Sequence, residues 1–196
     1  MSIENGTLTA PVGSTIAGLR LDSVSFVGDA VVVVSPDANR FISGISLTDS
    51  SIEGSLTSTE GSRLTLAGEI NNLGSINVES DNEGAEVSTV GDTVVQGGGE
   101  IVLSNDAQFS FSQLNNVDNT IRGDGALTDA FETINGGTIR AEGGTLEILL
   151  NFSFGGLDNS SGRIEVASDA HLALTCLLYT SPSPRDQRGS RMPSSA

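Results

Sequence analysis

The sequence contains no lysine and no tryptophan, and its only cysteine, tyrosine and histidine are Cys176, Tyr179 and His171. Cys176 lies near the end of the chain, and the absence of cysteine from 1–175 is compatible with either redox compartment. With one histidine, neither a Ser-His-Asp triad nor a histidine-based metal set is recognisable. We therefore expect His171 to be a solvent-facing strand residue or part of a ragged terminus.

Positive charge and long apolar runs are also scarce. The chain has 9 Lys and Arg against 25 Asp and Glu, a net charge of −16. Such a surface repels nucleic acid phosphates and anionic membranes, so we expect no nucleic acid partner. The longest apolar run, AVVVV at 30–34, is much shorter than the roughly 18 residues that a membrane span requires. We expect no membrane insertion by this part of the protein.

What the sequence does contain is a strand-and-turn pattern. Gly, Ser, Thr, Asn and Asp interrupt every apolar run, and apolar residues alternate with polar ones, as in Leu64-Thr65-Leu66 and Ile76-Asn77-Val78. A period of two places one set of side chains in a core and the other in solvent. The pattern predicts an all-β chain.

A turn followed by an isoleucine recurs along the chain. The intervals between successive isoleucines of this pattern are 24, 25, 20, 18 and 25 residues, and the positions are Ile52, Ile76, Ile101, Ile121, Ile139 and Ile164. A period near 22 is typical of a solenoid, in which each coil stacks on the next. We expect a right-handed parallel β-helix of roughly eight coils.

Stacked coils share one interior, and the alternation predicts which residues line it. Asparagines that precede strands at similar offsets are expected to stack as amide ladders inside the corners; they are Asn72, Asn116, Asn135 and Asn159. The expected apolar interior comprises Leu64, Leu66, Ile76, Val78, Ile101, Leu103, Phe109, Phe111, Ile121, Ile139, Leu146, Ile148, Ile164 and Val166.

The C-terminal segment, 176–196, differs from the rest of the chain. The string CLLYTSPSPRD resembles the translation of adapter DNA from a transposase-based sequencing library, and such non-native segments are excluded from fold reasoning. We expect a single solenoid across 1–175, cut from a longer protein at both ends, and a non-native tail at 176–196. Without Arg185, Arg188, Arg191 and Asp186 of the tail, 1–175 carries 6 basic and 24 acidic residues, a net charge of −18.

The segment LNNVDNTIRGDGALTDAFETINGGTIRAEGGTLEI at 114–148 carries the most specific pattern. It resembles the repeats of large bacterial β-solenoid proteins of the filamentous-haemagglutinin and autotransporter-passenger type, and 61–80 and 157–174 have the same style. The resemblance implies a structural or adhesive segment, extracellular or on the cell surface, with host or surface glycans or proteins as partners. It also implies an anchoring domain elsewhere in the parent protein.

Three acidic residues alternate before a glycine, as calcium ligands do: Glu79, Asp81 and Glu83 precede Gly84. An EF-hand loop beginning at Glu79 would need an acid at its twelfth position, which is Val90, and flanking helices. Solvated turn charges are the simpler interpretation. A calcium-stabilised secreted module therefore remains an alternative, with these three residues as its candidate ligands.

Catalysis is the remaining alternative, because parallel β-helices also host pectate-lyase-like enzymes and glycoside hydrolases. Such enzymes use clustered carboxylates. Asp124 and Asp129 could lie on one face of a coil, but nothing in the sequence marks them as a pair. Arg122-Gly123-Asp124 spells the integrin tripeptide, which is frequent by chance. We expect the chain to have no catalytic residue and no obligate cofactor.

Overall fold

The chain folds as a stack of β-strands in a computed structural model that describes residues 2–32, 44–59, 61–80, 84–150 and 156–176. No helix in these ranges could cross a membrane. The strands are β1 (Ser2–Ile16), β2 (Leu19–Val32), β3 (Gly44–Thr48), β4 (Ser51–Ile52), β5 (Ser55–Ser58), β6 (Arg63–Asn72), β7 (Ser75–Glu79), β8 (Glu86–Gln96), β9 (Glu100–Asn116), β10 (Thr120–Asn135), β11 (Thr138–Leu150), β12 (Leu157–Asp158), β13 (Arg163–Val166) and β14 (His171–Cys176).

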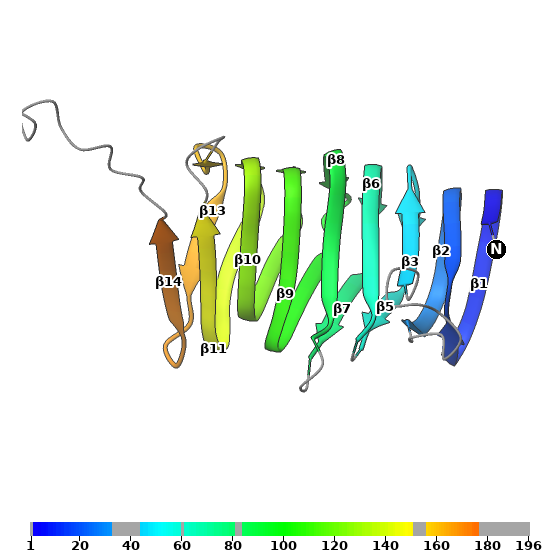
Figure 1. Ribbon diagram of the computed structural model, residues 1–196, viewed down its shortest axis with the longest axis horizontal. Helices are drawn as coiled ribbons and strands as arrows, with labels where there is room; N and C mark the ends of the chain where they lie inside the picture. The colour runs from blue at the N-terminus through cyan, green and yellow to red at the C-terminus, as the bar shows by residue number, and fades with distance from the viewer. Residues whose placement is uncertain (1, 33–43, 60, 81–83, 151–155, 177–196) are drawn as a thin grey trace, which may run out of the picture.

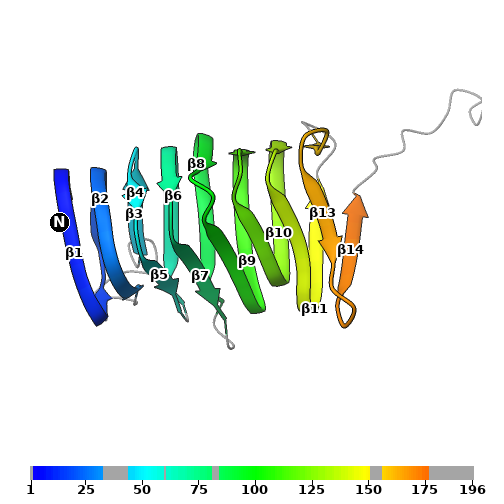
Figure 2. The ribbon, with the colours of Figure 1, turned by 180° about the vertical axis from the view of Figure 1, so that it is seen from behind.

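Successive coils pair in parallel from one end of a rod to the other. β1 pairs with β2, and the pairing continues through β9, β10 and β11 to β13 and β14. Figure 1 shows the strands side by side along the long axis, and Figure 2 shows the same order from behind. The protein is a parallel β-helix of about seven turns. This confirms the parallel β-helix expected from the turn-and-isoleucine period, with about seven turns in place of the roughly eight coils expected. Its right-handed sense stays a prediction.

Each coil has three faces, which one coil displays as three separate short strands. All strands belong to one continuous sheet, and we call the part of it that contains β3 face 1, the part that contains β4 face 2 and the part that contains β5 face 3. In other coils a single strand bends through the corners, so that β6 pairs with β3 on face 1 and with β4 on face 2. The faces enclose one continuous core, in which the largest side chains, such as Phe26 and Phe109, are fully buried.

One isoleucine column runs through face 3. Ile76, Ile101, Ile121, Ile139 and Ile164 are paired in register from β7 to β13. Twelve of the fourteen residues expected in the interior are buried: Leu64, Leu66, Ile76, Val78, Ile101, Leu103, Phe109, Phe111, Ile121, Ile139, Leu146 and Ile148.

The prediction was wrong for Ile164 and Val166, which are 36% and 50% exposed. Both lie on β13, which pairs with β11 and is the first strand in the order of the sheet. Among the described residues no further strand covers its other side, so inward-pointing side chains at this end keep contact with solvent.

The position assigned to Ile52 in the isoleucine column was also wrong. Ile52 is buried, but it lies on β4 in face 2, where it pairs with Phe26 and Asn72. The residue that pairs with Ile76 is Leu56, so this coil is shorter than the interval from Ile52 to Ile76 suggests. The alternation holds in both strands, and only the choice of strand was mistaken.

Asparagine amides stack inside one corner, as the sequence predicts. The Nδ2 of Asn116 donates to the Oδ1 of Asn135 at 2.8 Å, and the Nδ2 of Asn135 donates to the Oδ1 of Asn159 at 2.6 Å. Asn72 joins a different partner: its Nδ2 donates to the Oδ1 of Asn119 at 2.9 Å. Asn119 was not among the predicted residues. Because an unpaired buried amide is costly, these bonds fix the corner geometry.

Glycines occupy the adjoining position, at the start of face 3. A Cβ added to Gly54 would lie 1.9 Å from the carbonyl oxygen of Gly28, and a Cβ added to Gly74 would lie 1.9 Å from that of Gly54. No side chain fits at such a distance, so the stacking of the coils itself requires glycine here. The same condition explains the glycine-led turns that recur before the isoleucines.

Candidate functional site

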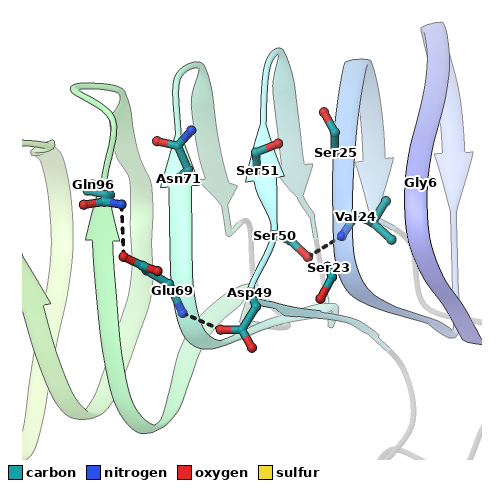
Figure 3. Close-up of a pocket in the computed structure, with 10 residues that line it drawn as sticks. All are labelled: Gly6, Ser23, Val24, Ser25, Asp49, Ser50, Ser51, Glu69, Asn71 and Gln96. Carbon is teal, nitrogen blue, oxygen red and sulfur yellow. Dashed lines mark hydrogen bonds between the residues drawn. The ribbon is translucent and has the colours of Figure 1, made fainter.

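A shallow polar groove lies where faces 1 and 2 meet, in the N-terminal half of the rod. Its volume is about 430 Å³ and its lining extends from Gly6 on β1 to Gln96 on β8. Figure 3 shows the ten lining residues across successive coils. Ligand pockets commonly have volumes of about 300–1,000 Å³, so the groove is large enough for a small polar ligand or part of a chain.

One wall of the groove is a row of four polar side chains on successive coils. Ser25 pairs with Ser51, Ser51 with Asn71, and Asn71 with Gln96, which brings the row into register on face 2. All four are partly buried. These residues occupy outward positions of their strands, because alternate residues such as Phe26 and Ile70 point into the core. The row is therefore a direct product of the coil register.

Two carboxylates lie beside this row. The backbone N–H of Glu69 donates to the Oδ1 of Asp49 at 2.9 Å, and the Nε2 of Gln96 donates to the Oε1 of Glu69 at 3.3 Å. A Cβ at Gly68 would lie 2.1 Å from the Oδ1 of Asp49, so glycine makes room for this carboxylate. Asp49 itself has a positive φ of 46°, a conformation that Asp adopts more readily than most residues with a side chain. Figure 3 shows the chain of contacts from Asp49 through Glu69 to Gln96.

Ser50 holds the corner together beneath the groove. Its hydroxyl donates to the carbonyl of Thr48 at 2.7 Å and accepts a hydrogen bond from the backbone N–H of Val24 at 3.2 Å. The residue is 4% exposed. Two coils are thereby joined by a side chain at the point where their backbones turn.

The groove carries negative charge and hydrogen-bonding capacity without a cation to balance it. No Arg or His is among its lining residues, and Asp49 and Glu69 form no ion pair within the described residues. The side chains of Ser51 and Asn71 make no hydrogen bond there either, and Figure 3 draws none. Their free hydroxyl and amide groups can both donate and accept.

The candidate calcium ligands are only partly described. Glu79 lies at the exposed end of β7, where it pairs with Ser104, and Asp81 and Glu83 lie outside the described residues. Among the described residues no group of three or more His, Cys, Asp or Glu side chains is placed to hold a metal ion.

Of the two acidic residues Asp124 and Asp129, the structure describes the side chain of Asp124 only. The Oδ1 of Asp124 accepts the backbone N–H of Asn105 at 3.1 Å, so this carboxylate stabilises a turn. The backbone of Asp129 pairs with Phe111, but its side chain lies outside the described part of the chain. Asp124 therefore has a structural partner, which was predicted neither by the acid-pair hypothesis nor by the Arg122-Gly123-Asp124 tripeptide.

The arginine of the Arg122-Gly123-Asp124 tripeptide is held on face 3. Arg122 lies in β10, and its Nη2 approaches Glu100 Oε2 at 3.0 Å while its Nη1 lies 3.8 Å from Glu142 Oε1. His171, the first residue of β14, is exposed, as expected. Neither residue is among those that line the groove.

The predicted junction of the tail falls inside a strand. β14 extends to Cys176, whose backbone pairs with Leu150, one residue beyond the expected boundary at Thr175. The remainder of the predicted tail, 177–196, lies outside the described residues.

The groove was missed by sequence reasoning because its residues are ordinary outward-facing strand residues. Each is separated from its neighbour in the row by a full coil of chain, and only the register brings them together. Comparison with known proteins adds no assignment: no protein family, no curated protein and no solved structure matches the chain.

Proposed function

We propose that this chain is a structural and adhesive rod, part of a β-solenoid protein of the cell surface or the secreted fraction. The observation that carries the proposal is the unbroken parallel pairing from β1 to β14, which stacks coils around one core and gives the molecule length. Repeat rods of this kind space and display binding surfaces along their walls. The polar groove at the corner of faces 1 and 2 is the binding surface that we assign to this role.

The distribution of acidic residues on the outer surface of the rod favours an adhesive role over a catalytic one. Acidic residues are spread over the coils and, in the described residues, gather into no metal-binding cluster. Catalysis by acid and base needs titratable groups brought together and tuned to their task. Binding through repeated weak polar contacts makes no such demand.

Adhesion can be tested with polystyrene beads that carry the purified full-length chain. Beads should attach to glycan-coated and cell-coated surfaces in a saturable manner, and free chain in solution should compete. Beads coated with a similarly acidic globular protein provide the control for charge. Attachment no better than that of the control beads would contradict the proposal.

A carbohydrate-active enzyme is the competing function, and one observation favours it: two carboxylates, Asp49 and Glu69, line the same groove. Glycoside hydrolases act through two carboxyl groups about 5–9.5 Å apart. Incubation of the chain with neutral and acidic polysaccharides should release no reducing ends above the buffer blank. Release that is lost in both Asp49→Asn and Glu69→Gln would establish the enzyme instead.

A calcium-stabilised module is the third possibility, carried only by Glu79 and its undescribed neighbours Asp81 and Glu83. Thermal unfolding in EDTA and in millimolar calcium separates it from the rod. A stable rod that does not need the ion should unfold at the same temperature in both, whereas a ligand that binds only the folded state would raise the midpoint.

A further inference from the structure

The polar row in the groove at the corner of faces 1 and 2 runs along the rod axis, and this orientation limits the shape of ligand that can contact the whole row. Its row from Ser25 to Gln96 crosses four coils, and neighbouring strands lie about 4.8 Å apart, so the row is about 14 Å long. The row runs along the rod axis, across the strands. An elongated ligand lying along the axis would meet one polar side chain per coil.

The groups in the row require a ligand that both donates and accepts hydrogen bonds. Ser51 and Asn71 have no side-chain partner in the described residues and offer a hydroxyl and an amide. The carboxylates of Asp49 and Glu69 are acceptors, and each has an oxygen that takes part in no hydrogen bond there. Closely spaced hydroxyl groups satisfy all of these groups at once, because each can donate to a carboxylate and accept from an amide.

The charge of the groove excludes anionic ligands. Uronic acids, sulfated sugars and phosphates would lie against Asp49 and Glu69, with no Arg or His in the lining to compensate. An apolar ligand would cover the side chains of Ser51 and Asn71, which form no hydrogen bond in the described residues, and leave them without partners. A neutral sugar chain avoids both penalties.

We propose that this groove binds a linear, neutral oligosaccharide that lies along the rod axis, with Asn71 and Glu69 as its principal contacts. The inference rests on the proposed adhesive function and specifies its ligand. The groove lining contains no aromatic side chain on which a sugar ring could stack, so each site binds weakly, with a dissociation constant of about 1 mM. Many rods on one surface would compensate by multivalent contact.

Saturation-transfer NMR on the full-length chain tests the ligand class. The probes are neutral hexasaccharides of β-1,4-glucose, β-1,3-glucose and β-1,4-mannose, with hexagalacturonate as the anionic probe and hexalysine as the cationic one. We expect at least one neutral hexasaccharide to bind and hexagalacturonate not to bind. No neutral binding at about 20 mM, or binding of hexagalacturonate or hexalysine alone, would overturn the inference.

Variants test the location. Asn71→Ala and Glu69→Gln should each weaken binding of the neutral hexasaccharide at least tenfold. Asn115→Ala and Glu132→Gln are matched controls, because both lie on later coils outside the groove lining. Unchanged binding in both groove variants would overturn the assignment even if the sugar binds. If one variant fails to fold, as judged by circular dichroism, the other still decides.

The bead experiment distinguishes a failure of the proposed adhesive function from a failure of the groove as its binding site. Beads that adhere to cells while the neutral hexasaccharides leave adhesion unchanged would keep the adhesive function and remove the groove as its site. Beads that do not adhere would remove the proposed function itself, whatever the NMR shows of the groove.

Discussion

Asn116 and Asn135 form a hydrogen bond of 2.8 Å between their side chains, although 19 residues separate them in the chain. Both are almost fully buried. The carboxamide of Asn135 continues the line by donating to Asn159. An interior amide with a donor on one side and an acceptor on the other fits a stack of coils, because each coil supplies what the next one needs.

Removing the middle amide of this ladder should destabilise the rod strongly. Asn135→Ala removes the Nδ2 group that donates to the Oδ1 of Asn159 at 2.6 Å. It also removes the Oδ1 that accepts a hydrogen bond from the Nδ2 of Asn116. We expect a loss of about 2–4 kcal/mol in the free energy of unfolding. Urea unfolding followed by circular dichroism measures it. Asn115→Ala, at a neighbouring outward position, should change stability by less than about 0.5 kcal/mol, and equal losses in the two variants would show that the ladder contributes nothing.

The second prediction concerns the glycines that stack on one another at the start of face 3, such as Gly54 and Gly74. The cost of a glycine-to-alanine change should depend on its position in the coil. Gly74→Ala places a Cβ 1.9 Å from the carbonyl oxygen of Gly54, whereas Gly98→Ala meets nothing within 4 Å but must adopt a φ of +72°. The left-handed conformation alone costs about 1–2 kcal/mol. We therefore expect Gly98→Ala to fold with that loss and Gly74→Ala to lose several times more or fail to fold. Similar unfolding midpoints would argue against the close approach of the coils.

Two isoleucines of one column should respond differently to truncation. Ile101 is 1% exposed in the middle of the rod, and Ile164 is 36% exposed on β13. Ile101→Ala removes fully buried methyl groups and leaves a cavity, with an expected cost of about 2–5 kcal/mol. Ile164→Ala should cost about 1 kcal/mol, because part of its apolar surface already contacts water. Thermal unfolding of the pair gives the comparison, and a larger effect at Ile164 would contradict the order of coils.

Asp158 carries a prediction about pH. Its Oδ1 accepts the backbone N–H of Ser160 at 2.9 Å, and this bond, with the Ser160 hydroxyl, lowers the pKa of Asp158 below its ordinary value of 3.8. Because the folded pKa is depressed, the contribution to stability is present above pH 3.8 and is lost as the pH falls through the folded pKa.

The titration of the Asp158 carboxyl group by ¹³C NMR should therefore have its midpoint below 3.8. Ser160→Pro removes both the N–H and the hydroxyl and should move the midpoint up towards that value. A midpoint that does not differ between the two proteins would mean that Ser160 has no influence on this carboxyl.

The sequence predicts the repeat well where turn, isoleucine and alternation coincide. Ile76 through Ile164 pair as the period requires, because a glycine or asparagine precedes each strand at the same corner. The prediction was wrong at Ile52, in the coil that is divided into three short strands. Both Ile52 and Leu56 are apolar and follow a turn there, but only Leu56 pairs with Ile76 in the column. Local alternation is the same in both strands, so only tertiary pairing distinguishes them.

The groove could not be predicted from the sequence for a related reason. Ser51 and Asn71 are polar residues at outward strand positions, of which this chain has many, and nothing local marks them. Their neighbourhood depends on the lengths of successive coils, which differ because the corners accommodate extra residues. The acidic residues that the sequence did single out were chosen by spacing along the chain, whereas the groove is organised across it.

The coil-on-coil pairing also determines how this rod can fold. Among the described residues, strand partners in adjacent coils lie close together in sequence: Ser14 pairs with Ala30, and Asp29 pairs with Ser55, which lies 26 residues further on. Relative to the 196 residues of the chain, this gives a contact order on the order of 0.1, a value more usual for helical bundles than for β-sandwiches. Each coil needs only its predecessor as a template, so assembly can advance from one end as the chain emerges, without waiting for distant segments to meet.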